Sequence, residues 1–294
     1  MLNENIFKGI GLLICSFILI TSCNQSSENE KDTRKHFRNE KGLLVKRTFY
    51  EEEGKEANVL TEKTFKVENG DTVLHGYAKS FYQDGQLMGE EHYKDGVKHG
   101  VSQQFYSSGQ VKHRGWIKNG KLDSTGLVYY EDGQMKAKGY FHKGKKIGEQ
   151  LNYHQNGKIK VYSFYNPVGE SVYIREYNAS GELTNEEGTK NTQLIYKGED
   201  AESNTGETLN VKIYAPTPPD CEVTLLVSIK DKNGQALIDK KPIAIKNGLA
   251  IYETELKEVG KYYFEATISF EDKATDEQQE YSNAFEYIVV NGGV

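Results

Sequence analysis

The sequence is poor in cysteine and proline, and it carries no excess of positive charge. Among 294 residues there are 3 Cys and 5 Pro, and the formal net charge is −6. So few cysteines exclude a small domain held together by a disulfide framework. A net negative charge excludes a chain that coats nucleic acid by charge alone, and we expect no nucleic-acid partner. Glycine and tyrosine are abundant, at 29 and 20 residues, as arrays of β-hairpins require.

One short pattern returns five times at a fixed interval of 24 residues. It starts with an aromatic pair or a single Tyr and reaches a glycine, at Gly85, Gly109, Gly133, Gly157 and Gly181. Between these glycines a second turn recurs at the same interval, at Asp95-Gly96, Asn119-Gly120 and Lys143-Gly144. Asn-Gly and Asp-Gly supply the positive φ angles that a two-residue hairpin loop needs. Each repeat is therefore predicted to be two strands and two turns.

Alternate positions of the repeats form columns of similar residues, which is typical of strands with one buried face. The apolar columns are Leu87, Val111, Met135 and Ile159, and Tyr93, Ile117, Phe141 and Tyr165. The interleaved positions are basic or aromatic. We therefore predict one apolar face and one face that combines cations with rings. A two-residue loop would also bring Phe105 and Tyr129 to the face of Trp116, so the sequence leaves open which face is exposed.

The interleaved positions give a candidate binding surface. It consists of Lys112, Arg114, Trp116, Lys136, Lys138, Tyr140 and Lys160. Cations beside rings could hold anionic sugars, acidic lipid headgroups or the acidic loop of a partner protein. The alternative is that lysine occupies exposed strand positions only to prevent aggregation.

The segment from Gly89 to Gly100, followed by Phe105-Tyr106, resembles a MORN repeat. It is most similar to the variant of bacterial proteins that is often labelled antitoxin-like. Residues Leu43 to Gly76 resemble an irregular copy that caps the array. The resemblance implies an all-β fold, an elongated antiparallel sheet of 24-residue hairpins, which we assign to residues 46–187.

The 24-residue interval stops near Gly188, and longer strands follow it. About a hundred residues with this many strands predict a β-sandwich, which we assign to residues 188–294. The stretch from Leu256 to Phe264 resembles an immunoglobulin-like E–F corner, with Tyr262 two positions before the core residue Phe264.

The N-terminus has the features of a targeting segment. Lys8 precedes an apolar run from Ile10 to Ile20, which predicts a signal peptide over residues 1–22. The sequence Ile20-Thr21-Ser22-Cys23 resembles the bacterial lipoprotein box. This resemblance implies that lipid is attached to Cys23, followed by a flexible tether over residues 23–45. We expect a lipid-anchored protein of the cell envelope, at the outer membrane; the acidic stretch after Cys23 resembles that of surface-exported lipoproteins.

No motif for a reaction, a metal or a cofactor is present. The seven histidines form no metal-binding pair of helical or Cys-x-x-Cys type, and there is no phosphate loop or nucleophile elbow. We therefore predict no catalytic residue, no metal and no cofactor, and a protein that is not an enzyme. The first function class is a membrane-anchored binding or assembly module that contacts protein, anionic glycan or lipid. The second is an antitoxin-like partner of an exported toxin, or an envelope enzyme with an unrecognised site.

Overall fold

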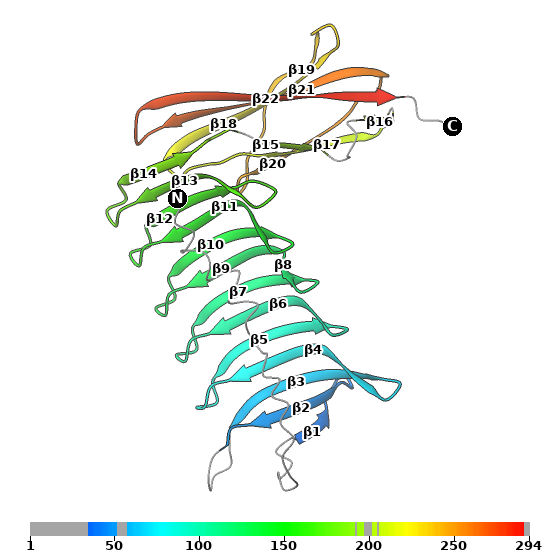
Figure 1. Ribbon diagram of the computed structural model, residues 1–294, viewed down its shortest axis with the longest axis vertical. Coiled ribbons are helices and arrows are strands. Elements are labelled where there is room, and N and C mark those ends of the chain that lie inside the picture. The colour runs from blue at the N-terminus through cyan, green and yellow to red at the C-terminus, as the bar shows by residue number, and fades with distance from the viewer. Residues whose placement is uncertain (1–34, 52–57, 192, 197–201, 205, 291–294) are drawn as a thin grey trace. The chain divides into compact units, whose positions relative to one another are not determined.

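A computed structural model describes residues 35–51, 58–191, 193–196, 202–204 and 206–290. These residues form strands and turns, and among them no helix is long and apolar enough to cross a membrane. The chain divides into two compact units, one up to Lys145 and one from Lys146. Figure 1 labels the strands of both units. The predicted all-β fold is confirmed. Cys23, the predicted lipid attachment site, lies outside the described residues.

The first unit is an antiparallel sheet whose strands follow one another in chain order, with β8 paired to β7 at its side. Its strands are β1 (Lys35–Arg38), β2 (Leu44–Phe49), β3 (Val59–Glu68), β4 (Asp71–Phe81), β5 (Leu87–Lys94), β6 (Val97–Phe105), β7 (Val111–Lys118), β8 (Lys121–Leu122), β9 (Ser124–Tyr129) and β10 (Met135–His142). Strand β1 lies within the predicted tether. It pairs with β2, and the Arg47 guanidinium lies 4.6 Å from the Phe37 ring centre, so the ordered sheet starts earlier than the sequence indicated.

Two kinds of turn alternate along the sheet, as the sequence predicted. In the two-residue turns both central residues have positive φ, for example 51° at Asp95 and 82° at Gly96. In the wider turns Tyr82 N donates to Gln86 O at 2.8 Å, and Gly85 N donates to Tyr82 O at 2.9 Å. The turn glycines are required because an L side chain rarely adopts their φ values.

Hydrogen bonds join each repeat to the next at both margins of the sheet. At one margin the hydroxyl of Tyr82 donates to Phe105 O at 2.7 Å, and that of Tyr106 donates to Tyr129 O at 2.9 Å. At the other margin the turn glycines donate to carbonyls of the preceding repeat: Gly96 to Leu74, Gly120 to Lys98 and Gly144 to Leu122, at 2.8, 2.9 and 2.8 Å. These bonds join positions at a constant sequence distance, which agrees with the constant interval of the glycines.

A β-bulge follows each wide turn, so the uninterrupted alternation of buried and exposed positions that the sequence predicted is wrong there. Phe105 lies opposite Val111, but the next pair is Gln104 with His113, so Lys112 is an extra residue. The alternation that placed Val111 and Ile117 in one buried set is therefore interrupted. Beyond the bulge His113, Gly115 and Ile117 are buried, whereas Arg114, Trp116 and Lys118 are exposed.

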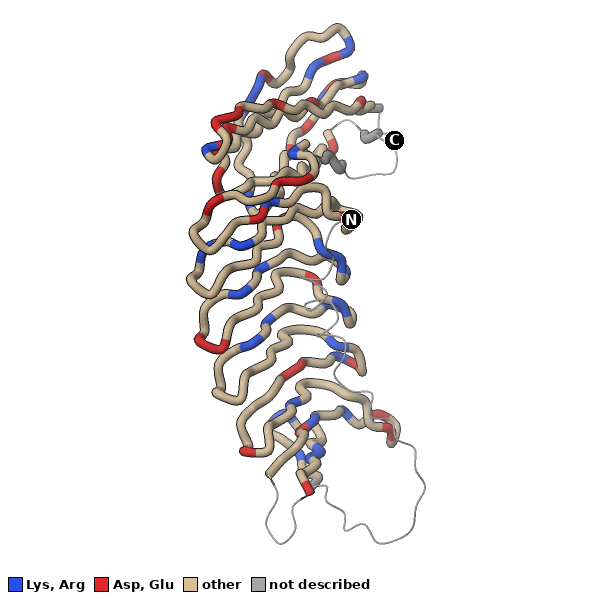
Figure 2. The backbone as a smooth tube through the Cα atoms, turned by 60° about the vertical axis from the view of Figure 1, so that its left-hand side comes forward, with Lys and Arg blue, Asp and Glu red and all other residues tan. Residues whose placement is uncertain are grey.

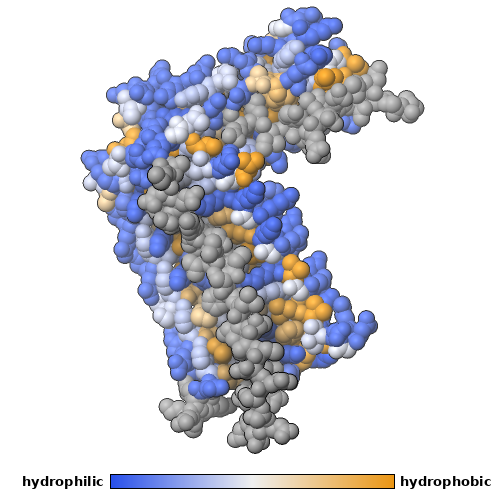
Figure 3. Space-filling view, in the orientation of Figure 1, coloured by the Kyte–Doolittle hydropathy of each residue, from blue (hydrophilic) through white to orange (hydrophobic). Residues whose placement is uncertain are grey.

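The buried face of the first unit carries a small apolar cluster. Its members are Ile117, Leu122, Val128, Ala137 and Phe141. The Leu122 side chain lies over Gly115, where an added Cβ would come within 2.6 Å of Leu122 Cδ1. On the face shown in Figure 3, apolar side chains of this unit gather between hydrophilic hairpin ends. On β7 the residues of the opposite face, Arg114 and Trp116, are exposed.

The second unit begins with the last hairpins of the repeat region. They contain β11 (Lys145–Tyr153), β12 (Ile159–Tyr165), β13 (Ser171–Tyr177) and β14 (Leu183–Gly188). The bond between repeats persists in changed form, because His154 replaces the tyrosine and its Nε2 lies 2.9 Å from Tyr177 O. The hairpin at Asn166 adopts the wide turn, with Asn166 N donating to Glu170 O at 2.9 Å. This change explains why Pro167 interrupts the Xaa-Gly series.

Two further sheets of the second unit share one core. The first contains β15 (Gln193–Tyr196), β17 (Thr208–Tyr214) and β20 (Leu249–Glu255), and the second contains β16 (Glu202–Asn204), β18 (Cys221–Asp231), β19 (Ala236–Pro242), β21 (Gly260–Asp272) and β22 (Glu277–Val290). Val211 of the first sheet and Phe264 of the second belong to the same buried cluster. The Tyr262 hydroxyl donates to Glu258 O at 2.7 Å. The immunoglobulin-like class of this region stays a prediction.

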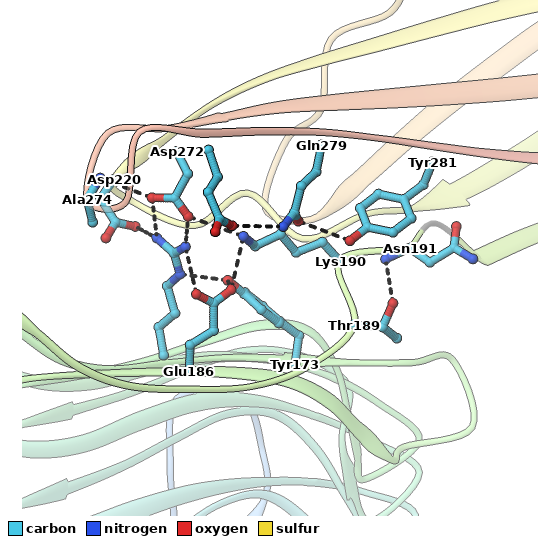
Figure 4. A network of polar contacts seen from close by, with 12 residues as sticks. Tyr173, Glu186, Thr189, Lys190, Asn191, Asp220, Asp272, Ala274, Gln279 and Tyr281 are labelled. Atoms are coloured by element: carbon cyan, nitrogen blue, oxygen red, sulfur yellow. Dashed lines mark hydrogen bonds and ion pairs between the residues drawn. The ribbon is translucent and has the colours of Figure 1, made fainter.

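A buried charge network joins the last hairpin to these sheets within the second unit (Figure 4). Arg175 of β13 is fully buried and pairs with Asp220, Asp272 and Glu186. Lys190 lies 3.2 Å from Asp272 and 3.0 Å from Glu186. Because Arg175 contacts three carboxylates far apart in the sequence, it fixes β13 against the start of β18 and the end of β21.

Replacement of Arg175 by Met should destabilise the second unit strongly. The substitution keeps much of the side-chain volume but leaves the buried Asp272 without its guanidinium partner. Removing one member of a buried ion pair costs about 3–5 kcal/mol. Urea unfolding followed by circular dichroism measures the change in the free energy of unfolding.

The exposed pair Lys230–Glu265, at 3.3 Å, provides the control. Exposed ion pairs contribute about 0–1 kcal/mol, so Lys230→Met should have a small effect. An Arg175→Met loss no larger than that of Lys230→Met would show that the network does not hold the unit together.

Candidate functional site

The face of the first unit that carries Arg114 has one continuous row of side chains across eight strands. We call it the charged row. Its members, each opposite the next on a neighbouring strand, are Arg47, Glu62, Lys79, Glu90, Gln103, Arg114, Leu127 and Lys138. Figure 2 shows lysine and arginine recurring from strand to strand along this unit. Because neighbouring strands lie about 4.8 Å apart, the row crosses the strands at a constant step.

The first half of the charged row is neutralised internally. Arg47 Nε lies 2.5 Å from Glu62 Oε2, and Lys79 Nζ lies 4.0 Å from Glu90 Oε2. Tyr77 donates its hydroxyl to Glu62 at 2.6 Å. Burial and this bond raise the pKa of Tyr77 to about 12. Partial burial raises the pKa of Glu62, but Tyr77 and Arg47 outweigh it and the net pKa is lowered, so Glu62 stays ionised.

The second half of the row carries positive charge without an acidic residue between the cations. The row neighbours of Arg114 are Gln103 and Leu127, and Leu127 is in turn opposite Lys138. Arg114 is exposed and Lys138 is half-buried. This half therefore presents two cations with an apolar side chain between them.

Aromatic rings lie beside these cations on the same two strands. Trp116 follows Arg114 by two positions, and 45% of its surface is exposed. The His99 ring meets the Trp116 ring edge-on, with ring centres 6.2 Å apart. Tyr140 follows Lys138 by two positions, and Lys138 Nζ lies 5.3 Å from its ring centre. A large exposed indole beside a cation is a surface that can bind a ligand.

The structure brings together four of the seven predicted surface residues, namely Arg114, Trp116, Lys138 and Tyr140. The other three lie elsewhere. Lys112 and Lys136 follow the wide turns, and their ammonium groups lie over the rings of Tyr106 and Tyr130, at 5.3 and 5.4 Å. Lys160 is an exposed residue of β12 in the second unit.

Sequence reasoning missed Gln103 and Leu127 as members of this surface. Columns in the sequence compare equivalent positions of successive repeats, which lie on every second strand. Leu127 lies on the strand between Arg114 and Lys138, so only the pairing register shows that it separates them. Counting outward from the Asn119-Gly120 turn would place Thr125 opposite Arg114, because the pairing of β7 shifts by two residues between Ile117–Leu122 and Arg114–Leu127.

Ion pairs at the hairpin ends do not form a metal site. Lys66 and His75 both contact Asp95, at 2.6 and 3.2 Å, and His142 Nδ1 lies 2.8 Å from Asp123 Oδ1. Lys66 and then His75 lower the pKa of Asp95. Within the described residues no three His, Cys, Asp or Glu side chains converge on a point where a metal could be held.

Four successive segments match the family described as MORN repeat variant. The matched residues are 74–95, 98–119, 122–143 and 146–166. Residues 74–166 are four tandem MORN repeats. The segments start 24 residues apart, which is the interval of the glycines, so the predicted MORN repeats are confirmed over this range. A comparison with curated proteins found no match.

One ionisable residue of the second matched segment, His113, faces the buried side of the sheet. His113 lies between Gln104 and Val128 on neighbouring strands and is 9% exposed. Burial, and to a lesser degree the charges of Lys112 and Lys136, lower the pKa of His113 to about 4. The imidazole is therefore neutral in the folded protein at pH 7.

His113 should make the first unit less stable in mild acid than at neutral pH. An unfolded histidine has a pKa of about 6.5, so between pH 6.5 and 4 the unfolded chain takes up a proton that the folded chain does not. Stability should fall as the pH decreases through this window, and the full loss is reached below about pH 4. Melting temperatures at pH 7 and pH 5 should differ less for His113→Gln than for the wild type. The exposed His36→Gln is the control, and an equal pH dependence in all three proteins would contradict the assignment.

Proposed function

We propose that the protein is a non-catalytic binding module that presents the charged row of its MORN sheet to an acidic ligand. MORN repeats are commonly binding or assembly modules. The observation that carries the proposal is the cluster of Arg114, Trp116, Lys138 and Tyr140 on the exposed face. Cations attract the ligand over a distance, and rings add contacts that salt does not screen.

The rigidity of the sheet supports the same proposal. Hydrogen bonds at both margins hold successive repeats at a fixed distance, so the side chains on the exposed face keep their spacing without a ligand. A preorganised surface loses little conformational entropy on binding.

We further propose that lipid on Cys23 anchors the protein in the cell envelope, at the outer membrane. The apolar run from Ile10 to Ile20 and the lipoprotein-box-like sequence that ends at Cys23 support this location. Several acyl chains hold a protein on a membrane more firmly than one. The ligand is then a protein, an anionic glycan or an anionic lipid of the envelope. The second function class, an antitoxin-like partner or an enzyme, is not favoured by any feature of the charged row.

Binding should depend on both the cations and the rings. The full chain with Cys23→Ala, which carries no lipid, is titrated with hyaluronan, poly-glutamate and phosphatidylglycerol vesicles, with dextran as the neutral probe. Loss of one aromatic contact costs about 1 kcal/mol, or roughly fivefold in affinity. Trp116→Ala should weaken binding at low and high salt, and Lys138→Ala should weaken it mainly at low salt.

Lys79→Ala is the matched control for Lys138→Ala. Both lysines belong to the charged row, but Lys79 lies opposite two glutamates, Glu62 and Glu90, and away from Trp116 and Tyr140. Lys79→Ala should leave the affinity unchanged. Binding of none of the acidic probes, or equal weakening by both lysine variants, would contradict the proposed surface.

The lipid anchor is tested by metabolic labelling with a fatty-acid probe. The wild-type protein should be labelled and recovered with membranes, and Cys23→Ala should lose both properties. Cys221→Ala is the control because Cys221 lies in the second unit. Equal labelling of Cys23→Ala and the wild type would contradict the anchor.

A further inference from the structure

The face opposite the charged row holds a small cavity among β3, β4, β5 and β6, which follow one another in the sheet (Figure 1). Ala78 and Ser80 flank Lys79 of the charged row in the sequence, so their side chains point to the other face. The cavity has a volume of about 30 Å³, which is the space of about two water molecules. The side chains that surround it at Gly89 include Lys63, Ser80, Met88, Glu91 and Gln104.

The cavity exists because one repeat lacks a side chain that later repeats have. Steps of 24 residues from Gly89 lead to His113, Ala137 and Val161. Gly89 lies opposite Ser80 on one neighbouring strand and Gln104 on the other, so the space between these two residues stays open. The cavity is therefore a property of the first matched segment, residues 74–95.

Two neutral hydrogen-bonding side chains face this space. A Cβ atom added at Gly89 would lie 3.4 Å from Ser80 Oγ and 3.9 Å from Gln104 Cγ. Both side chains are half-buried, and hydroxyl and amide groups both donate hydrogen bonds. A ligand above Gly89 therefore meets two neutral donors.

The charge on the cavity wall is positive. Lys63 lies between Lys46 and Ala78 on the neighbouring strands, so neither residue opposite it is acidic. Glu91 also lines the cavity, but its Oε1 lies 2.6 Å from Lys98 Nζ, and this ion pair neutralises the carboxylate. The charge of Lys63 is the one that a ligand in the cavity meets.

We propose that the cavity binds the carboxylate group of a small aliphatic acid. The two oxygens occupy the space above Gly89, accept hydrogen bonds from Ser80 and Gln104, and pair with Lys63. Hydrogen bonds to an ionised acceptor are about twice as strong as those between neutral groups. Phosphate and sulfate, which have more oxygens than a carboxylate, exceed a space of about two water molecules.

Met88 favours an alkyl chain as the rest of the ligand. It also lines the cavity, and its flexible apolar side chain adapts to the shape of an apolar group. Butyrate is therefore a suitable probe. The site is independent of the proposed function, because Arg114 and Trp116 lie on β7 and belong to the opposite face.

Equilibrium dialysis of the full chain with Cys23→Ala tests the ligand class. Butyrate should bind saturably, and its affinity should fall as the salt concentration rises, because salt screens the charge of Lys63. Butyramide has nearly the same shape without the charge, and it should bind about tenfold more weakly. Inorganic phosphate should not compete with butyrate.

Gly89→Ala should fill the cavity. The added methyl group takes the place of a carboxylate oxygen, so the affinity for butyrate should fall about tenfold. The φ angle of Gly89 is not positive, and a later repeat has Ala137 at the corresponding position, so the melting temperature should be unchanged or higher. Gly260→Ala is the matched control, because it lies in the second unit and its Cβ would meet the nearest non-adjacent residue at 3.7 Å.

Lys63→Met tests the cation separately from the space. It keeps much of the side-chain volume but removes the charge, so the affinity for butyrate should fall about tenfold at low salt. Lys46→Met is the control, because Lys46 lies opposite Lys63 on the next strand but over the Phe65 ring, with Nζ 4.9 Å from the ring centre. Its effect should be much smaller.

Three results would overturn the carboxylate site. They are equal affinity of Gly89→Ala and the parent chain for butyrate, equal affinity for butyrate and butyramide, and absence of saturable butyrate binding at millimolar concentration. Trp116→Ala should leave butyrate binding unchanged, and a loss there would move the site to the charged row. Failure of this site and failure of the charged row are thus seen with different probes and in different variants.

Discussion

The structure of the repeat region depends on hydrogen bonds between residues one repeat apart. Tyr106 reaches the backbone of the next hairpin, and Gly120 reaches that of the preceding one. The tyrosine donors at Tyr82 and Tyr106 lie 23 residues from their acceptors, whereas the hydroxyl of Tyr50 donates to Phe81 O over 31 residues, so the bond also forms across a longer first repeat. From Tyr82 to Tyr129 the constant distance between donor and acceptor agrees with the fixed interval of the glycines.

The fixed 24-residue interval also determines which side chains lie next to one another on the face that carries Arg114. Because every strand keeps its register, side chains from many repeats line up in rows that cross the strands. In the charged row, the early repeats use glutamates to neutralise their cations, as Glu62 does for Arg47. Beside Arg114 the same positions carry Gln103 and Leu127, so no glutamate of the row lies opposite that cation.

The buried network around Arg175 shows where the repeat pattern and the compact units differ. The 24-residue interval continues to Gly181, yet Arg175 pairs with Asp272 inside the second unit. The last hairpin therefore serves two purposes: it extends the repeats in the sequence, and it contributes the cation around which the following sheets are fixed. The predicted domain boundary at residue 188 stays a prediction, whereas the compact unit begins at Lys146.

The sequence by itself determined the strands, the turns and the repeats. Glycine positions and Xaa-Gly turns are local signals, since a positive φ at Gly96 or Gly120 is a property of the residue itself. Only the tertiary structure decided which face is exposed, because the bulge at Lys112 interrupts the alternation that the sequence indicated. It also decided that Leu127 separates the two cations and that Arg175 pairs with Asp272, because contacts between distant strands depend on register and packing, which no short pattern of residues encodes.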